Sequence, residues 1–109
     1  MRMWMVNPKF LCRQHLLGEH QETHSFVGCI KKGTSLKGYV KNGLIEVHNL
    51  KERHQQLAQE MLERGYNHQS PLPEFEAYEC GIINKEENMN ELRKRCPECQ
   101  KRIMTSNSI

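Results

Sequence analysis

The sequence predicts an all-α protein: residues 1–109 as one single domain of about three helices joined by loops. Three observations support this prediction. In three segments, apolar residues recur at helical spacing between residues that are typical of helix ends. No segment of convincing length alternates apolar and polar residues, as a half-buried strand would. The length of 109 residues suits one domain with one small core.

The first predicted helix follows Asn7 and Pro8 and extends to the lysine pair Lys31 and Lys32. Asparagine is a favoured N-cap, and proline suits the first helical position. The two lysines suit the negative end of the helix dipole, and Gly33 can end the helix. The apolar residues of this segment form one broad stripe: Phe10, Leu11, Leu16, Leu17, Phe26, Val27 and Ile30.

The second and third predicted helices have similar ends. Asn49 and Asn84 can each act as an N-cap, and each has a glutamate three residues later, as in a capping box. Gly65 can end the second helix, and Pro97 prevents the third from continuing past Arg95. Two loops connect the three helices, a glycine-rich basic loop at 33–43 and a loop with two prolines at 67–75.

The charge, hydropathy and cysteine content of the chain argue against a membrane protein and a secreted disulfide-bonded protein. The formal net charge of +3 is mild and suits an anionic partner without requiring one. The sequence has neither the apolar run of a signal peptide nor that of a membrane-spanning helix, so we expect no membrane association. Its five cysteines are an odd number without the arrangement of a secreted disulfide framework, which predicts a reducing cytoplasm.

The stretch "EHQETH" places His20 and His24 one helical turn apart, which is the spacing of a helical zinc pair. The zincin motif has its glutamate directly after the first histidine, where this chain has Gln21. A third ligand would also have to come from elsewhere in the chain. We therefore favour a solvated helix face over a metal site here, for His20 above all.

The stretch "CPEC", from Cys96 to Cys99, resembles half of a zinc knuckle. Cys80 is a candidate third ligand, and the fourth would be Cys12, Cys29 or a histidine. A pair of free thiols near a C-terminal tail is the simpler interpretation, and we favour it. A thioredoxin-like role is disfavoured because no βαβ unit is predicted.

The ordered set of segments resembles one family. The segment "RQHLLGEHQETHSFVGCIKKG" (13–33) is similar to the first helix of the pyrimidine-dimer DNA glycosylases, small phage repair enzymes also called endonuclease V. The segment "LKERHQQLAQEMLERGYN" (50–67) resembles the second helix of that family, and "MRMWMVNPKFL" resembles a branch that begins Met-Arg-Leu-Trp. The matching residues of the first helix are His15, Glu22, Gly28, Lys31 and Lys32.

This resemblance implies a compact helical repair enzyme that cleaves the N-glycosidic bond of a damaged base, such as a pyrimidine dimer, and then nicks the strand as an AP lyase. It implies that the α-amine of Met1 is the nucleophile and that Glu22 is the essential acid. It implies no cofactor or metal for the chemistry, a monomer, and double-stranded DNA with a damaged or abasic site as partner. The candidate DNA contacts are Arg2, Gln14, His15, Lys31 and Lys32.

The chain also departs from the family pattern. The phage enzyme has arginines beside its catalytic glutamate, where this chain has Gln21 and Ser25, and its aromatic tail is replaced here by the "CPEC" region. Those features serve DNA grip and dimer recognition. We therefore expect the catalytic pair to be kept, and a different damaged or modified base stays an alternative substrate.

The implied chemistry suits an N-terminal amine. Imine formation requires an unprotonated amine, and the reference pKa of an α-amino group is about 7.7–8.0, against about 10.4 for lysine. An α-amine therefore has more than about a hundredfold more free base near neutral pH. Methionine aminopeptidase removes Met only before small residues, so Arg2 should keep Met1 in place, while Trp4 can anchor this end on the core.

Two other functions compete with this hypothesis. The first is a non-enzymatic, zinc-stabilised helical module that binds nucleic acid and holds its metal through Cys80, Cys96 and Cys99. The second is a family remnant that binds DNA without cutting it. Metal content separates the first from a glycosylase, and cleavage of abasic DNA separates the second.

Overall fold

The computed structural model describes residues 1–67 and 70–106, and within these ranges it contains helices and no strand. The predicted all-α class is confirmed, but the described residues form five α-helices where about three were predicted. The elements are η1 (Pro8–Phe10), α1 (Arg13–Lys32), α2 (Lys37–Lys41), η2 (Val47–Asn49), α3 (Leu50–Glu63), α4 (Lys85–Arg95) and α5 (Pro97–Ser106).

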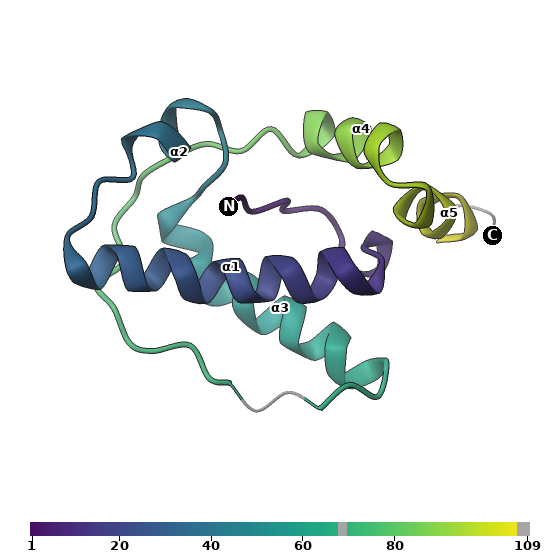
Figure 1. The fold of residues 1–109 in the computed structure, drawn as a ribbon, viewed down its shortest axis with the longest axis horizontal. Helices are drawn as coiled ribbons and strands as arrows, with labels where there is room; N and C mark the ends of the chain where they lie inside the picture. Colours follow the sequence, from purple (N-terminus) through teal and green to yellow (C-terminus); the bar gives the residue numbers. More distant parts are fainter. Residues whose placement is uncertain (68–69, 107–109) are drawn as a thin grey trace.

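The long helix α1 crosses the molecule, and α3 packs across it (Figure 1). Helices α4 and α5 lie at the end of the molecule where α1 begins, and α5 packs on η1. The N-terminal segment runs back over the middle of α1, so the first residue lies well inside the outline of the fold (Figure 1). No helix among the described residues has both the length and the apolar character needed to cross a bilayer.

Helix α1 begins later than predicted. Asn7 does act as a cap, but it caps the 3-10 helix η1 by accepting a hydrogen bond from the Lys9 N–H at 3.0 Å. Leu11 and Cys12 are then extended, which separates η1 from α1, and the Cys12 side chain caps α1. The predicted end at Gly33 is confirmed, because this residue has φ 73° and its N–H reaches the last carbonyls of the helix.

The starts of the next two long helices were predicted correctly, with one wrong detail. Asn84 caps α4 by accepting from the Glu87 N–H at 3.0 Å. Asn49 precedes α3, but its side chain makes no capping hydrogen bond and instead donates to Glu46 Oε1 at 2.8 Å. The Asn49 side chain is thus oriented by Glu46 and does not accept a hydrogen bond from the first turn of α3.

Two helices were missed. Helix α2 is one short turn inside the predicted loop at 33–43, and Gly38 within it, a poor helix former, gave no helical signal. Helix α5 begins at Pro97, directly after α4 ends. Proline ends the helix before it but suits the first turn of the next, because the first turn needs no amide donor. The "CPEC" stretch is therefore a junction between two helices and not a tail.

The N-terminal segment is part of the core. Met3, Trp4 and Val6 are almost fully buried, Trp4 and Val6 in one apolar cluster and Met3 in a second. Each buried side chain of this size contributes roughly 1.5–3 kcal/mol of transfer free energy. Met5, between them, has the positive φ of 57°, which L-residues rarely adopt. Burial on both sides of Met5 stabilises this conformation and holds the segment on α1.

A buried ion pair connects this segment with the two long helices. Arg53 of α3 donates from Nη2 to Glu19 Oε1 of α1 at 2.9 Å, and from Nη1 to the Val6 carbonyl at 2.7 Å. Both charged side chains are almost completely shielded from solvent. Burying two charges is costly unless both are paired and hydrogen-bonded, and here the pairing is bidentate. The pair therefore fixes how α1, α3 and the N-terminal segment meet.

Candidate active site

The first residues of the chain are held by hydrogen bonds to distant parts of the fold. The Met3 N–H donates to the Leu44 carbonyl at 2.8 Å. Asn88 of α4, which is buried, donates from Nδ2 to the Trp4 carbonyl at 2.8 Å and to the Met3 carbonyl at 3.3 Å. Met1 itself is 39% exposed. The chain end is thus fixed in position while its first residue stays partly exposed to solvent.

Arg2 is tied to the protein more firmly than a free phosphate ligand would be. Its Nη2 donates to Asn88 Oδ1 at 2.7 Å, and its Cζ lies 3.8 Å from the centroid of the Trp4 ring. Burial, together with the neighbouring charge of Arg95, lowers the pKa of the Arg2 guanidinium. These contacts confirm the prediction that Trp4 anchors the terminus. The predicted DNA contact of Arg2 stays a prediction.

Glu22 of α1 faces this anchored terminus. Its Oε2 accepts a hydrogen bond from the backbone N–H of Arg2 at 3.3 Å. Burial raises the pKa of the Glu22 carboxyl; the Arg2 hydrogen bond and the ammonium group of Met1 lower it, but the net shift is upward. The nearby charge of Glu19 adds to the upward shift. The carboxyl thus lies close to the amine of Met1, in a half-buried setting that keeps its proton bound to a higher pH than in an ordinary glutamate.

This arrangement combines an amine and a carboxyl in a fixed geometry. A carboxyl with a raised pKa can take up and return a proton during a reaction. An ionised carboxylate can also stabilise a positive charge that develops on the amine nitrogen. The pair can therefore support reactions that pass through an iminium ion.

The remaining polar candidates lie along α1. Gln14 is exposed near its start, and Lys31 and Lys32 are exposed at its end. Gln14 and Lys32 are about five turns apart, so they project from the same side of the helix with roughly 27 Å between them. Glu22 lies between them along the axis.

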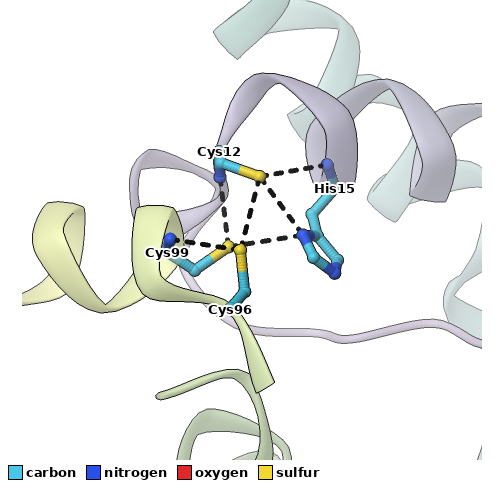
Figure 2. Close-up of side chains that lie close together, drawn as sticks. All are labelled: Cys12, His15, Cys96 and Cys99. Carbon is cyan, nitrogen blue, oxygen red and sulfur yellow. Dashed lines mark hydrogen bonds between the residues drawn. The ribbon is translucent and has the colours of Figure 1, made fainter. Parts of the chain in front are cut away.

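His15 was predicted to contact DNA, and the structure places it in a cluster of cysteines at the start of α1 (Figure 2). Its Nδ1 lies 3.2 Å from Cys12 Sγ and 3.5 Å from Cys99 Sγ. Burial, with a smaller effect from Arg95, lowers the pKa of the His15 ring, which favours neutral imidazole. The DNA contact stays a prediction, and only Nε2 is left to make it.

Cys80, the predicted partner of the "CPEC" cysteines, lies elsewhere. It packs against the second apolar cluster, and its N–H donates to His48 Nδ1 at 3.2 Å. The two cysteines of "CPEC" are instead joined by Cys12 and His15. Cys12 and a histidine were among the alternatives for a fourth ligand, but the prediction of Cys80 as a third is wrong. The pairing depends on how α5 packs on η1, which no local pattern indicates.

The preferred interpretation of "EHQETH" as a solvated face is wrong for His20, which is only 8% exposed. His20 and His24 meet His54 of α3, and their ring nitrogens lie within 4.8 Å of one another. His24 Nε2 and His54 Nε2 are 3.2 Å apart, and both lie close to the Ser70 carbonyl. The third histidine that a metal would require is therefore present, supplied by a helix crossing.

Sequence reasoning missed two residues that build the site. Asn88 holds the first peptide units, and Arg53 holds the Val6 carbonyl together with Glu19. Arg53 had a detectable signal, because it lies within the apolar stripe of its helix, between Leu50 and Leu57. Asn88 had none, since an asparagine inside a polar helix is ordinarily exposed.

Comparison with known proteins adds one match. A family model described as "Pyrimidine dimer DNA glycosylase" matches residues 1–74. These residues include the anchored terminus, the whole of α1 and the whole of α3. A search of curated proteins and a search of solved structures each found no significant match.

Proposed function

Because the chain belongs to the pyrimidine dimer DNA glycosylase family, we propose that it is a DNA repair glycosylase with AP lyase activity. It cleaves the N-glycosidic bond of a damaged base, with a pyrimidine dimer as the first candidate, and then nicks the strand. The observation that carries this proposal is the hydrogen bond from the Arg2 N–H to Glu22, which fixes the terminal amine beside a half-buried carboxyl.

In the proposed reaction the lone pair of the Met1 amine attacks C1′ of the damaged nucleotide. The bond from C1′ to the base nitrogen breaks, and the base leaves with the electron pair and takes up a proton. The sugar ring then opens as the bond between C1′ and O4′ breaks, which leaves an iminium ion between Met1 and C1′. Loss of a proton from C2′ expels the 3′ phosphate and nicks the strand.

Glu22 is the proposed acid and base of these steps. Its carboxylate stabilises the iminium ion, and its carboxylic acid form protonates O4′ during ring opening. Removal of the C2′ proton then requires the carboxylate again. The upward shift of the Glu22 pKa suits this exchange, because both protonation states are accessible nearer to neutral pH than for an ordinary glutamate.

The DNA duplex is proposed to lie along α1. Lys31, Lys32 and Arg2 would contact phosphates, and Gln14 and His15 would contact the backbone or groove near the other end. A base inside the stack is out of reach of a side chain, so the enzyme has to extrude a nucleotide. The phage enzyme has arginines beside its catalytic glutamate, where this chain has the exposed Gln21 and the nearby Ser25. A modified base is therefore the second candidate substrate.

The test uses borohydride reduction. The full-length chain is incubated with duplexes that carry an abasic site, a pyrimidine dimer or one of several modified bases, and sodium borohydride is added. We expect a covalent adduct on the abasic duplex, and peptide mapping should place it on the peptide that contains Met1 and Arg2. An adduct on a lysine would overturn the assignment of Met1, and the absence of any adduct or nick on every duplex would overturn the lyase.

Family membership does not favour the alternative of a non-enzymatic zinc-stabilised module. A remnant that binds DNA without cutting would retain affinity for the same duplexes and yield no adduct. The borohydride experiment therefore separates the enzyme from that remnant.

A further inference from the structure

Four potential metal ligands converge where the start of α1 meets the junction of α4 and α5 (Figure 2). Cys12 is the N-cap of α1 and His15 lies in its first turn, with two residues between them. Cys96 and Cys99 come from the α4–α5 junction, with the same spacing. The three sulfur atoms and His15 Nδ1 all lie within 4.8 Å of one another.

The distances match those of a tetrahedral zinc site. Zn²⁺ with Zn–S bonds of about 2.3 Å holds two sulfurs about 3.8 Å apart, and with a Zn–N bond of about 2.0–2.1 Å it holds a sulfur and a nitrogen about 3.6 Å apart. The Sγ atoms of Cys12 and Cys96 are 3.8 Å apart. His15 Nδ1 lies 3.2 Å and 3.5 Å from the Sγ atoms of Cys12 and Cys99.

Backbone amides point at the sulfurs. The Cys12 N–H donates to Cys99 Sγ at 3.3 Å, the His15 N–H to Cys12 Sγ at 3.4 Å, and the Cys99 N–H to Cys96 Sγ at 3.4 Å. Such hydrogen bonds stabilise negative charge on sulfur, which is the form that binds a metal. All three sulfurs therefore already have an outer shell of donors that suits a thiolate.

The surroundings fit a closed site. Cys99 is fully buried and Cys12 is 9% exposed, so bulk water has little access to the centre of the cluster. The Trp4 ring meets the His15 ring edge-on, with centroids 5.8 Å apart, which helps to fix the imidazole. The charged residues that line the groove beside Cys12 are four cations and one acid: Arg13, Arg64, Lys101, Arg102 and Glu98. These cations would offset the net charge of −1 that Zn²⁺ acquires with three thiolates and a neutral imidazole.

We propose that Cys12, His15, Cys96 and Cys99 bind one structural Zn²⁺ ion, with His15 coordinating through Nδ1. Three soft thiolates and one imidazole in a tetrahedral arrangement suit zinc, and four protein ligands leave no open position for catalysis. This ion would clamp α1, which carries Glu22, to the end of α4, which carries Asn88, and to the start of α5. It would also join residues beyond the family match, which ends at residue 74, to the matched part.

The first experiment measures metal content and geometry in the wild-type chain. The protein is expressed with zinc in the medium and a C-terminal tag that contains no histidine, and metals are quantified by mass spectrometry. We expect about one zinc per chain. Cobalt added to the metal-free protein should give the strong visible bands of tetrahedral Co²⁺ and sulfur-to-cobalt charge transfer. This cobalt measurement needs no variant, so it does not depend on how substitutions affect folding.

Variants then assign the ligands. Cys96→Ser and His15→Ala should lose most of the zinc, and their melting temperatures should fall by at least about 5 °C. His15→Cys should keep about one zinc, because a fourth thiolate can replace the imidazole, and should shift the cobalt charge-transfer bands. Cys29→Ser and Cys80→Ser are the matched controls, since both residues are half-buried cysteines outside the cluster, and both should keep the metal.

Several outcomes would overturn the proposal. One is a wild-type chain that contains no zinc and gives no tetrahedral cobalt spectrum. Another is full zinc content in Cys96→Ser together with its loss in His24→Ala, which would assign the metal to the histidine cluster. A third is iron in place of zinc in the purified protein. The last is a disulfide between Cys12 and Cys96 in the purified protein, detected after denaturation without reductant as a missing pair of titratable thiols.

Discussion

The backbone N–H of Arg2 lies 3.3 Å from Oε2 of Glu22, so the first peptide bond of the chain rests on a carboxyl twenty residues further along the sequence. Glu22 is held by α1, and the terminal segment is held by Asn88 and by the Arg53 ion pair with Glu19. The relation between the terminal amine and the carboxyl is therefore set by three separate parts of the fold, and changes to either group have testable consequences.

Substituting Glu22 by glutamine should abolish most strand cleavage. Glutamine keeps the size of the side chain but can neither carry the charge nor exchange the proton, and acid–base groups of this kind contribute about 10²–10⁴-fold. Single-turnover nicking of an abasic duplex measures the effect, and circular dichroism checks the fold. Glu79→Gln, at an exposed position, is the control. Nicking by Glu22→Gln at the wild-type rate would remove Glu22 from the reaction.

Blocking the terminus should abolish imine formation without unfolding the chain. A short N-terminal extension converts the amine of Met1 into an amide, which is not nucleophilic, and also moves the new amine away from Glu22. The borohydride adduct should disappear, while a C-terminal tag of the same length should leave it unchanged. If the extended chain forms the adduct at the wild-type rate, another amine is the nucleophile.

Ionisation of Glu22 should destabilise the folded protein as the pH rises. Burial raises the pKa of this carboxyl, so the folded protein binds the proton more tightly than the unfolded chain. The stabilisation from the bound proton is complete below the ordinary glutamate pKa of about 4.3 and is lost as the pH rises through the raised value. The free energy of unfolding of Glu22→Gln, measured relative to that of the wild type, should therefore be higher at about pH 7 than at about pH 4.

Urea unfolding at the two pH values measures that difference. The exposed variant Glu79→Gln should show little change between them, which separates the effect from a general response to pH. A relative loss of stability in Glu22→Gln on raising the pH would mean that hydrogen bonding, and not burial, dominates at this carboxyl.

Breaking the buried ion pair should be costly. Arg53→Met leaves Glu19 charged and unpaired in the interior and frees the Val6 carbonyl, at a cost of about 3–5 kcal/mol. The double variant Glu19→Leu/Arg53→Met removes both charges and should recover a large part of this loss. Lys9→Met removes an exposed lysine from Glu60 and Glu63, and buried Glu60 keeps its ion pair with Arg64, so this control should have little effect. Chemical denaturation of the four proteins gives the comparison, and equal stability of the single and double variants would refute it.

DNA binding should weaken steeply with salt. Lys31 and Lys32 are exposed at the end of α1 and are proposed to replace counterions on phosphates. The double variant Lys31→Gln/Lys32→Gln should lower the log–log salt slope by about two. Lys51→Gln, at an exposed position of α3, which has no proposed DNA contact, is the control and should not change it. Fluorescence anisotropy at several salt concentrations measures the slopes, and an unchanged slope in the double variant would exclude the two lysines from the interface.

The helical class and the principal helix ends could be predicted because they depend on neighbouring residues. The spacing of apolar residues, the αL conformation of Gly33 and the cap at Asn84 are all local effects. The start of α1 was predicted too early, because the Asn-Pro signal belongs to the 3-10 helix η1. Two extended residues then separate η1 from α1. Pro97 was correctly expected to end α4, yet the same ring begins α5.

The sequence by itself determined the residue types available for chemistry, their positions on helices, and the resemblance to a family that the match to residues 1–74 confirmed. Only the tertiary structure decided which of them meet. Glu22 reaches the terminus, His54 joins His20 and His24, and Cys12 rather than Cys80 joins Cys96 and Cys99. The physical reason is that helix ends follow from hydrogen bonds within a few residues. Contacts between distant residues depend instead on how whole helices pack, and burial and buried ion pairs summed over the entire chain select that packing.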